Sequence, residues 1–190
     1  MSNGLNLWED PMAIPTRRLT LRPARMRDAQ DMYEYSKDPE VARHVLWEAH
    51  RSIRETRAVL RRMIRDYRYA PPFTYVIELK DERRVIGTIG LMSFAGANRS
   101  AEIGYSLSRA YWNRGLMTEA LQGMLKYCFS ELKLNRVEAQ HEVGNPASGA
   151  VMRHAGMRHE GTLRKRIFNK GKFHDMELYA ILKEEFHARV

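Results

Sequence analysis

The sequence predicts one α/β (α+β) domain around a mixed, mostly antiparallel sheet. Short runs of alternating apolar residues, typical of strands, recur along the chain, and longer segments with apolar residues at helical spacing interrupt them. Their order is strand, two helices, three antiparallel strands, helix, strand, helix and a closing hairpin, which makes about seven strands and about four helices. A chain of 190 residues suits a single well-cored domain.

The segments divide the chain into an N-terminal extension, residues 1–15, with Leu7 and Trp8 as its apolar contacts, and a domain at residues 16–187. The expected strands lie at 16–23, 73–79, 85–94, 101–107, 136–142, 158–168 and 173–182. The expected helices lie at 28–37, at 52–69, after residue 115 through Leu132, and at 147–155.

Composition indicates a soluble protein with anionic partners. The chain is 44% hydrophobic and 29% charged, has a net charge of +9, and holds no apolar run near the roughly 18 residues that a membrane span needs. Glu9, Asp10 and Pro11 stand where an export signal would be apolar, so we expect a cytoplasmic protein without membrane contact. The single cysteine, Cys128, lies on an apolar helix face and is predicted to be a packed thiol.

The stretch Tyr111 to Ala120 separates an expected strand from an expected helix and is a candidate anion site. A tight loop before a helix turns unpaired backbone N–H groups and the positive helix end toward an anion. Arg114 would add a charged contact, and Gly115 lets the backbone approach the ligand closely. Taken alone, the stretch also fits an ordinary strand-to-helix turn, which is the simpler interpretation.

A basic stripe follows the second helix. Five arginines recur there at spacings of three and four residues, at positions Arg54, Arg57, Arg61, Arg65 and Arg68. Such a stripe is typical of a solvated face. As an alternative, it would attract an acidic or RNA-rich target.

Four stretches, in this order, resemble the GNAT acyltransferases and specifically their RimJ/RimL-like branch, which includes ribosomal-protein N-terminal acetyltransferases. They are residues 16–23 (TRRLTLRP), 101–105 running into 111–120, 145–148 ending at Gly156-Met157, and 175–179 (DMELY). The resemblance covers about residues 16–183. The chain departs from the family's loop pattern at Trp112 and Met117, but backbone N–H groups, which any non-proline residue supplies, make most contacts there.

The resemblance implies that acetyl-CoA lies between the strands at 101–107 and 136–142, the fourth and fifth of the family fold, which splay apart in a V. The pantetheine arm would pair with the backbone of Ile103, Tyr105 and Leu107. The pyrophosphate would lie on the loop formed by Trp112, Asn113, Arg114, Gly115, Leu116, Met117 and Thr118. Asn145 and Ser148 match positions that contact the pantetheine arm and approach the sulfur. The alternatives are a turn residue for Asn145 and a helix cap for Ser148.

For acetyl transfer to an amine, Glu102 is the candidate general base, through a water molecule, since the amine must lose a proton. Its alternative role is a surface or salt-bridged strand residue. Ser148 is the candidate for protonating the leaving thiolate, because Met152 occupies the place where many GNAT enzymes carry a tyrosine. His141, Glu142 and His174 could also face the cleft, although a strand histidine is more often structural. The sequence shows no set of cysteines or histidines at metal-ligand spacing.

The resemblance indicates the acceptor amine less directly than it indicates the fold and the cofactor. We expect direct transfer in a ternary complex to a protein or peptide N-terminal amine, with ribosome association as a possible consequence. A small amine acceptor, such as an antibiotic, a polyamine or an amino acid, is the alternative. A non-catalytic basic RNA- or ribosome-binding module is the alternative of another class. The acceptor side would be built from the region of Trp47, the first two helices and the closing hairpin, in a monomer or homodimer.

Overall fold

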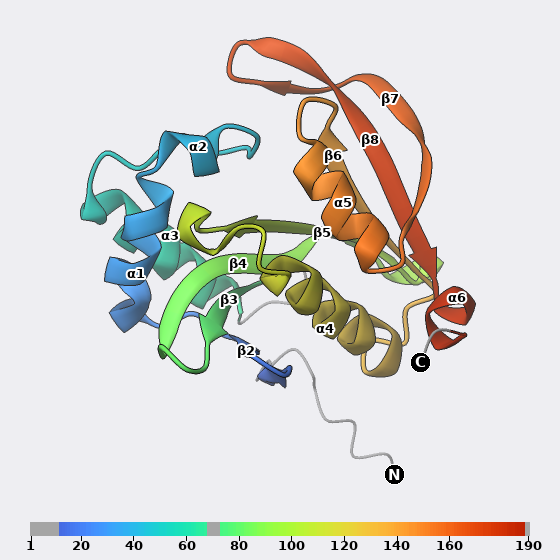
Figure 1. The fold of residues 1–190 in the computed structure, drawn as a ribbon, viewed down its shortest axis with the longest axis horizontal. Coiled ribbons are helices and arrows are strands. Elements are labelled where there is room, and N and C mark those ends of the chain that lie inside the picture. The colour runs from blue at the N-terminus through green and yellow to red at the C-terminus, as the bar shows by residue number, and fades with distance from the viewer. Residues whose placement is uncertain (1–11, 68–72, 189–190) are drawn as a thin grey trace.

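A computed structural model describes residues 12–67 and 73–188 of the chain (Figure 1). The contacts expected of Leu7 and Trp8, the basic residue Arg68 and the predicted helix end at Tyr69 lie outside these ranges. Within the ranges, no helix is long and apolar enough to cross a bilayer.

The described residues contain one sheet of eight strands. They are β1 Ile14–Pro15, β2 Leu19–Arg22, β3 Thr74–Leu79, β4 Arg84–Ala95, β5 Ser100–Leu107, β6 Arg136–Glu142, β7 Arg158–Asn169 and β8 Lys172–Leu182. The spatial order is β1-β2-β3-β4-β5-β6-β8-β7. Neighbours are antiparallel except β5 and β6, which are parallel. The mixed, mostly antiparallel sheet is therefore confirmed, and β1 adds a short strand within the stretch assigned to the extension.

The four predicted helices are present, and two short ones accompany them. In chain order the helices are α1 Ala29–Ser36, α2 Pro39–Ala42, α3 Ile53–Asp66, α4 Leu116–Ser130, α5 Pro146–His154 and α6 Lys183–His187. The short α2 and α6 were not predicted, because one turn of helix is too brief to show a period.

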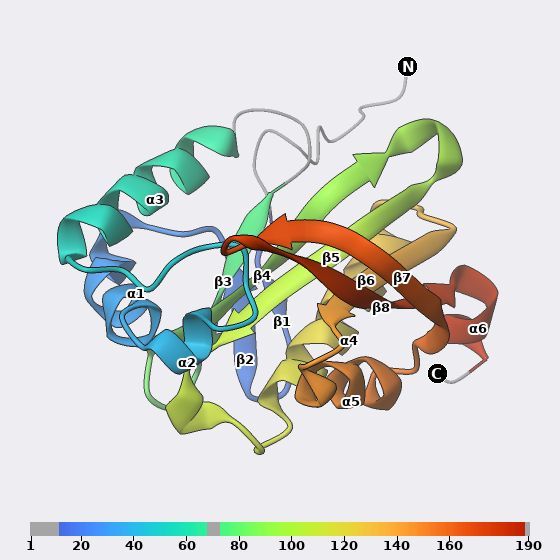
Figure 2. The same cartoon turned by 90° about the horizontal axis from the view of Figure 1, so that it is seen from above.

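Helices cover both faces of the sheet. As Figures 1 and 2 show, α4 and α5 lie on one face, whereas α1 and α3 lie on the other. Neighbouring strand residues therefore enter different cores: Ile77 packs in the cluster that includes α4, and Val76 packs in the cluster that includes Met32 of α1 and Leu60 of α3. Cys128 is fully buried on the α4 side, as its position on the apolar helix face predicted.

The closing hairpin of β7 and β8 extends beyond the rest of the sheet (Figure 1). Its two-residue turn is Lys170-Gly171, and the strands pair up to Asn169 and Lys172. Lys170 has φ 51° and Gly171 has φ 80°. Two consecutive positive φ angles are characteristic of the tight turns that match the twist of a hairpin, which is where the sequence predicted the turn.

Candidate active site

The parallel strands β5 and β6 diverge and leave a gap. Three residue pairs join them, ending at Glu102 and Glu138. Beyond that point β5 stays paired with β4, and β6 stays paired with β8. The predicted V-shaped splay is therefore confirmed, and it begins at the candidate base Glu102.

The edge of β5 offers backbone groups to this gap. Ser108 N donates to Ile86 O of β4 at 2.7 Å, whereas Leu107 O accepts from the Trp112 indole, away from β4. Since backbone groups of successive strand residues alternate in direction, those of Ile103, Tyr105 and Leu107 all face the gap. Three consecutive odd positions thus present an unpaired strand edge where β6 has moved away.

The loop before α4 holds a row of free donors. Among the described residues, no oxygen accepts a hydrogen bond from the backbone N–H groups of Asn113 through Thr118. Asn113 has φ 59° and Gly115 has φ 70°, so the backbone curls in the left-handed region before the helix begins. The side chains of Leu116 and Met117 are buried, which leaves only their N–H groups for a ligand. Curled backbone at a helix N-terminus is suited to an anion.

Trp112 and Arg114 shape the two sides of the loop. The Trp112 Nε1–H donates to Leu107 O at 2.8 Å, which joins the loop to the end of β5 and occupies one lone pair of that carbonyl. The Arg114 guanidinium lies 5.3 Å from the centre of the Tyr111 ring. This cation–π contact keeps the exposed arginine beside the loop.

Glu119, in the first turn of α4, attaches the loop to the first strands. Its carboxylate accepts from Thr16 Oγ1 at 2.7 Å, from Arg18 N at 2.6 Å and from Arg18 Nε at 2.7 Å. Arg18 also donates to the carbonyl of Arg114 at 3.1 Å. Burial opposes ionisation of Glu119, but the hydrogen bonds from Arg18 and Thr16 lower its pKa below the ordinary value. Residues 16–18 were predicted to be part of a strand. In the structure they hold the loop before α4 in place through Glu119 and the Arg114 carbonyl.

Replacing Glu119 with glutamine should destabilise the protein in a pH-dependent way. The folded-state pKa is depressed, so the stabilisation is present above the ordinary pKa of 4.5 and disappears as the pH falls through the lower folded value. We expect a loss of about 1–2 kcal/mol near neutral pH, from charged hydrogen bonds that become weaker neutral ones. Urea unfolding of both proteins at several pH values measures it. Glu131→Gln, at the exposed end of the same helix, should have no such effect, and an equal loss in acid would contradict the assignment.

Glu102 lies on the α1 side of the gap. Its Oε1 accepts from Gln140 Nε2 of β6 at 2.7 Å, so the side chain spans the two diverging strands. Gln140 Oε1 is buried without a partner among the described residues. The pair therefore combines a carboxylate with an unsatisfied amide oxygen where the strands separate, a place suited to an ordered water molecule.

Tyr105 and Ser148 form a hydroxyl pair on the opposite, α5 side. Their hydroxyl oxygens are 2.9 Å apart, and the phenol also lies 3.2 Å from the Ser148 carbonyl. Burial raises the pKa of the Tyr105 phenol above its ordinary value, and the hydrogen bond to Ser148 opposes this. Met152, at the place of the family's usual tyrosine, is 1% exposed and belongs to the core. A tyrosine hydroxyl is thus present beside Ser148, but it comes from Tyr105 of β5 and not from the position of Met152 in α5. The sequence did not reveal this pair.

Asn145 and the histidines have structural partners. Asn145 caps α5, since its Oδ1 accepts from Ser148 N at 3.4 Å, so the cap is Asn145 and Ser148 lies one turn inside the helix. His141 Nδ1 donates to Glu142 O at 2.7 Å, and its Nε2 is buried without a partner among the described residues. The described residues contain no group of His, Cys, Asp or Glu suited to a metal ion.

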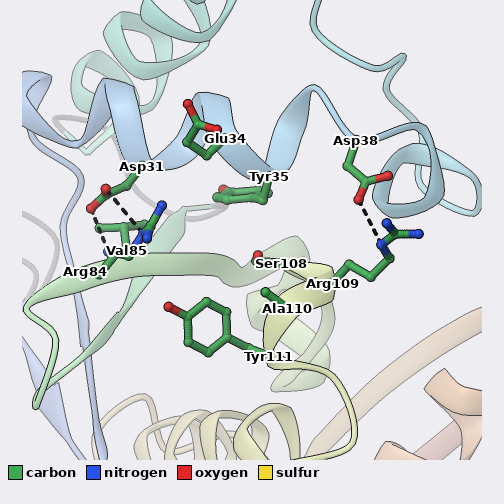
Figure 3. A pocket seen from close by; sticks show the side chains of 10 residues that line it. All are labelled: Asp31, Glu34, Tyr35, Asp38, Arg84, Val85, Ser108, Arg109, Ala110 and Tyr111. Atoms are coloured by element: carbon green, nitrogen blue, oxygen red, sulfur yellow. Dashed lines mark hydrogen bonds and ion pairs between the residues drawn. The ribbon is translucent and has the colours of Figure 1, made fainter.

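A surface hollow lies next to this site, and of the predicted stretch Tyr111 to Ala120 only Tyr111 lines it. Figure 3 shows its walls, formed by α1, the start of β4 and the 3₁₀ turn Arg109–Tyr111 that follows β5. Two ion pairs cross it, Arg84 with Asp31 at 3.7 Å and Arg109 with Asp38 at 3.2 Å. The first pair connects α1 to the start of β4, and the second connects the residue before α2 to the 3₁₀ turn after β5, so we regard the hollow as part of the frame of the gap.

Known proteins share this arrangement. Residues 18–158 match the family model of the acetyltransferase (GNAT) domain. The N-acetyltransferase p20 of Bacillus licheniformis is 34% identical over 174 residues, which are 90% of this chain and 96% of p20. The ribosomal-protein-serine acetyltransferase of Escherichia coli is 31% identical over 99 residues, 52% of this chain and 55% of that one.

The solved structures include RimJ of Mycobacterium smegmatis in complex with CoA-disulfide. It superimposes with a TM-score of 0.82 at 28% identity and covers 92% of this chain and 89% of its own. Three observations point to the same family. The parallel strands diverge, a loop of free N–H groups precedes a helix, and the acetyltransferase family model matches most of the chain. The chain belongs to the GNAT acetyltransferase family and is an acetyl-CoA-dependent N-acetyltransferase.

Proposed function

We propose that the acceptor is the N-terminal amine of a protein or peptide, and that the acetyl group passes to it directly in a ternary complex. The observation that carries this is the gap itself, with Glu102 on one face and the Tyr105–Ser148 pair on the other. An amine and a thioester can therefore approach from opposite faces. The similarity to the E. coli ribosomal-protein-serine acetyltransferase supports a protein acceptor.

The cofactor residues of this proposal follow from the free backbone groups. The N–H groups of residues 113–118 would hold the pyrophosphate, with Trp112 and Arg114 beside it. The edge of β5 at Ile103, Tyr105 and Leu107 would pair with the pantetheine amides as an added strand does. Asn145 and Ser148 would contact the arm near the sulfur. Bound acetyl-CoA supplies the activated acetyl group, and the residues of the chain orient it and move protons.

Proton transfer is assigned to one group on each face. Glu102 accepts the proton that the acceptor amine loses, through a water molecule that Gln140 Oε1 also binds. On the other face, Ser148 Oγ–H donates a proton to the departing sulfur, and Tyr105 orients the serine hydroxyl. The amine nitrogen gains the acetyl group and loses one proton, and the sulfur gains one. Glu102 then releases its proton to solvent and Ser148 regains one from solvent, so protons and charge balance over the turnover.

Direct transfer, without an acetylated enzyme, is supported by the burial of Cys128, the only cysteine of the chain. Cys128 is 0% exposed, and burial raises the pKa of its thiol to about 12. A thiol that is buried and protonated is a poor nucleophile, so the route through an acetylated cysteine is disfavoured. Trapping a competent acetyl-enzyme would contradict direct transfer.

A turnover assay by free-thiol release tests the proposal. Acetyl-CoA is supplied together with pooled N-terminal peptides, ribosomal proteins or small amines such as polyamines and aminoglycosides. We expect turnover with free N-terminal amines and none after these are blocked by formylation. Turnover confined to small amines would replace the proposed acceptor, and salt-dependent RNA binding without acetyl-CoA binding would favour a non-catalytic module.

Ribosome association is proposed through the basic face of α3. Arg54, Arg57, Arg61 and Arg65 are exposed, and only Arg65 has a described ion pair, with Asp66 at 3.5 Å. Replacing Arg54, Arg57 and Arg61 with glutamine should weaken binding to ribosomal RNA, and the slope of log K against log salt should become shallower by about 0.7–0.9 per lost phosphate contact. Fluorescence anisotropy at several salt concentrations measures it. The control removes the same charge from scattered exposed positions, Arg27, Lys126 and Lys133. Equal weakening by both variants would contradict a specific surface.

A further inference from the structure

Residues 38–45, which we call the strap, connect the two arms of the V. At one end Asp38 pairs with Arg109, two residues beyond the end of β5, at 3.2 Å (Figure 3). At the other end His44 Nδ1 lies 2.7 Å from Glu142 Oε2, at the end of β6. Because β5 and β6 run parallel, their C-terminal ends lie at the same end of the sheet. The strap connects these two strand ends and so spans the mouth of the gap.

The strap lies on the same face as the candidate base. Val41, in its middle, packs with α1 and α3. Glu142 lies two residues after Gln140, so its side chain points to the same face of β6 as the amide that binds Glu102. The strap therefore borders the face of the gap from which an acceptor would approach Glu102.

Two histidines share the Glu142 carboxylate. His174 Nδ1 lies 2.5 Å from Oε1, and His44 occupies Oε2. His174 Nε2 also lies 3.0 Å from the carbonyl of Asn169. Both ring nitrogens of His174 therefore have oxygen partners within hydrogen-bond distance. The side chains of His174 and Glu142 are 10% and 19% exposed, so their contact is shielded from water.

The hairpin also holds the strap directly. Asn169 Nδ2 donates to Val45 O at 3.1 Å, and Lys170 Nζ donates to Ala42 O. Asn169, Lys170 and His174 surround the turn between β7 and β8. The strap is thus fixed by the 3₁₀ turn Arg109–Tyr111, by β6 and by the hairpin, which are far apart in the chain.

We propose that the strap, held by the cluster of His44, Glu142 and His174, encloses the acceptor face of the gap and determines which amines reach Glu102. With the cluster formed, a slender chain end fits beside the strap and a bulky folded surface does not. This inference rests on the proposed N-terminal amine acceptor. The three residues act by positioning the strap and make no contact with the reacting atoms.

The first test measures opening of the strap without catalysis. Hydrogen exchange, followed by mass spectrometry, reports on the amides of Ala42, Arg43 and Val45, which are hydrogen-bonded within the strap. Glu142→Gln keeps the shape and removes the charge, so exchange of a 38–48 peptide should become about tenfold faster. Glu177→Gln is the matched control, because it removes a carboxylate that pairs with His159 on the same hairpin, away from the strap.

Unchanged exchange in Glu142→Gln, or an equal change in Glu177→Gln, would overturn the inference whichever amine is the acceptor. If Glu142→Gln does not fold, His44→Asn replaces it, since this change removes the strap's contact and leaves the His174 pair intact.

The second test compares acceptors of different size. In the opened variant, KM for a folded protein with a free N-terminus should fall relative to KM for a short peptide, and KM for acetyl-CoA should stay constant. An unchanged ratio would refute the selective role and leave the proposed acceptor standing.

Discussion

Replacing Glu102 with glutamine should lower kcat by about 10²- to 10⁴-fold near neutral pH, the usual contribution of a positioned general base. Glutamine has nearly the same shape and can still bond to Gln140, but it cannot take the proton of the acceptor amine. The affinity for acetyl-CoA should change little, because the proposed cofactor contacts come from the backbone of β5 and of the loop before α4. Steady-state kinetics across pH, together with titration of CoA, separate the two quantities.

Glu138→Gln is the matched control for this prediction. Glu138 lies directly opposite Glu102 in the β5–β6 register, and its carboxylate pairs with Arg136 at 2.6 Å. Its replacement should leave kcat within a few-fold of the wild type. A rate within threefold of the wild type would reject Glu102 as the base.

Much of the fold was predictable from local patterns, because strands and helices of ordinary length show their period in the sequence. The strand at 136–142 was predicted with the bounds that the structure has, and the closing hairpin was predicted to turn between 168 and 173, where the structure has its turn. The short elements β1, α2 and α6 were missed. One turn of helix or two residues of strand depend on tertiary contacts, and such contacts leave no periodic signal.

In the candidate site, too, local features were predictable from the sequence and contacts between distant residues were not. Backbone functions follow the chain, so the loop at 113–118 was a candidate from consecutive residues, and the family resemblance implied the edge of β5. Side-chain pairs could not, because their members are distant in sequence. Tyr105 meets Ser148 across 43 residues, and Arg18 meets Glu119 across 101. Only the folded chain brings them together, which is why the tyrosine hydroxyl beside Ser148 was found in the structure alone.

Arg22 is a further case in which the local pattern and the fold disagree. The alternation of Leu19 and Leu21 with Thr20 and Arg22 predicts a first strand that could lie at the edge of the sheet. Helices cover both faces of the sheet, however, and Arg22 is 6% exposed. Its guanidinium makes two hydrogen bonds to Asp28, each 2.9 Å, and one to Glu78 at 2.7 Å. The bonds to Asp28, followed by those to Glu78, raise its pKa above the ordinary value, while burial opposes this.

Replacing Arg22 with methionine should therefore lower the free energy of unfolding by about 3–5 kcal/mol, the usual cost of removing one partner from a buried ion pair. Methionine fills much of the space, but the Asp28 carboxylate, 4% exposed, is left without its cation. Urea unfolding at neutral pH measures the loss. Arg27→Met, an exposed neighbour, should cost less than about 0.5 kcal/mol. A loss in Arg22→Met as small as that in Arg27→Met would show that the ion pair does not hold β2 to the turn before α1.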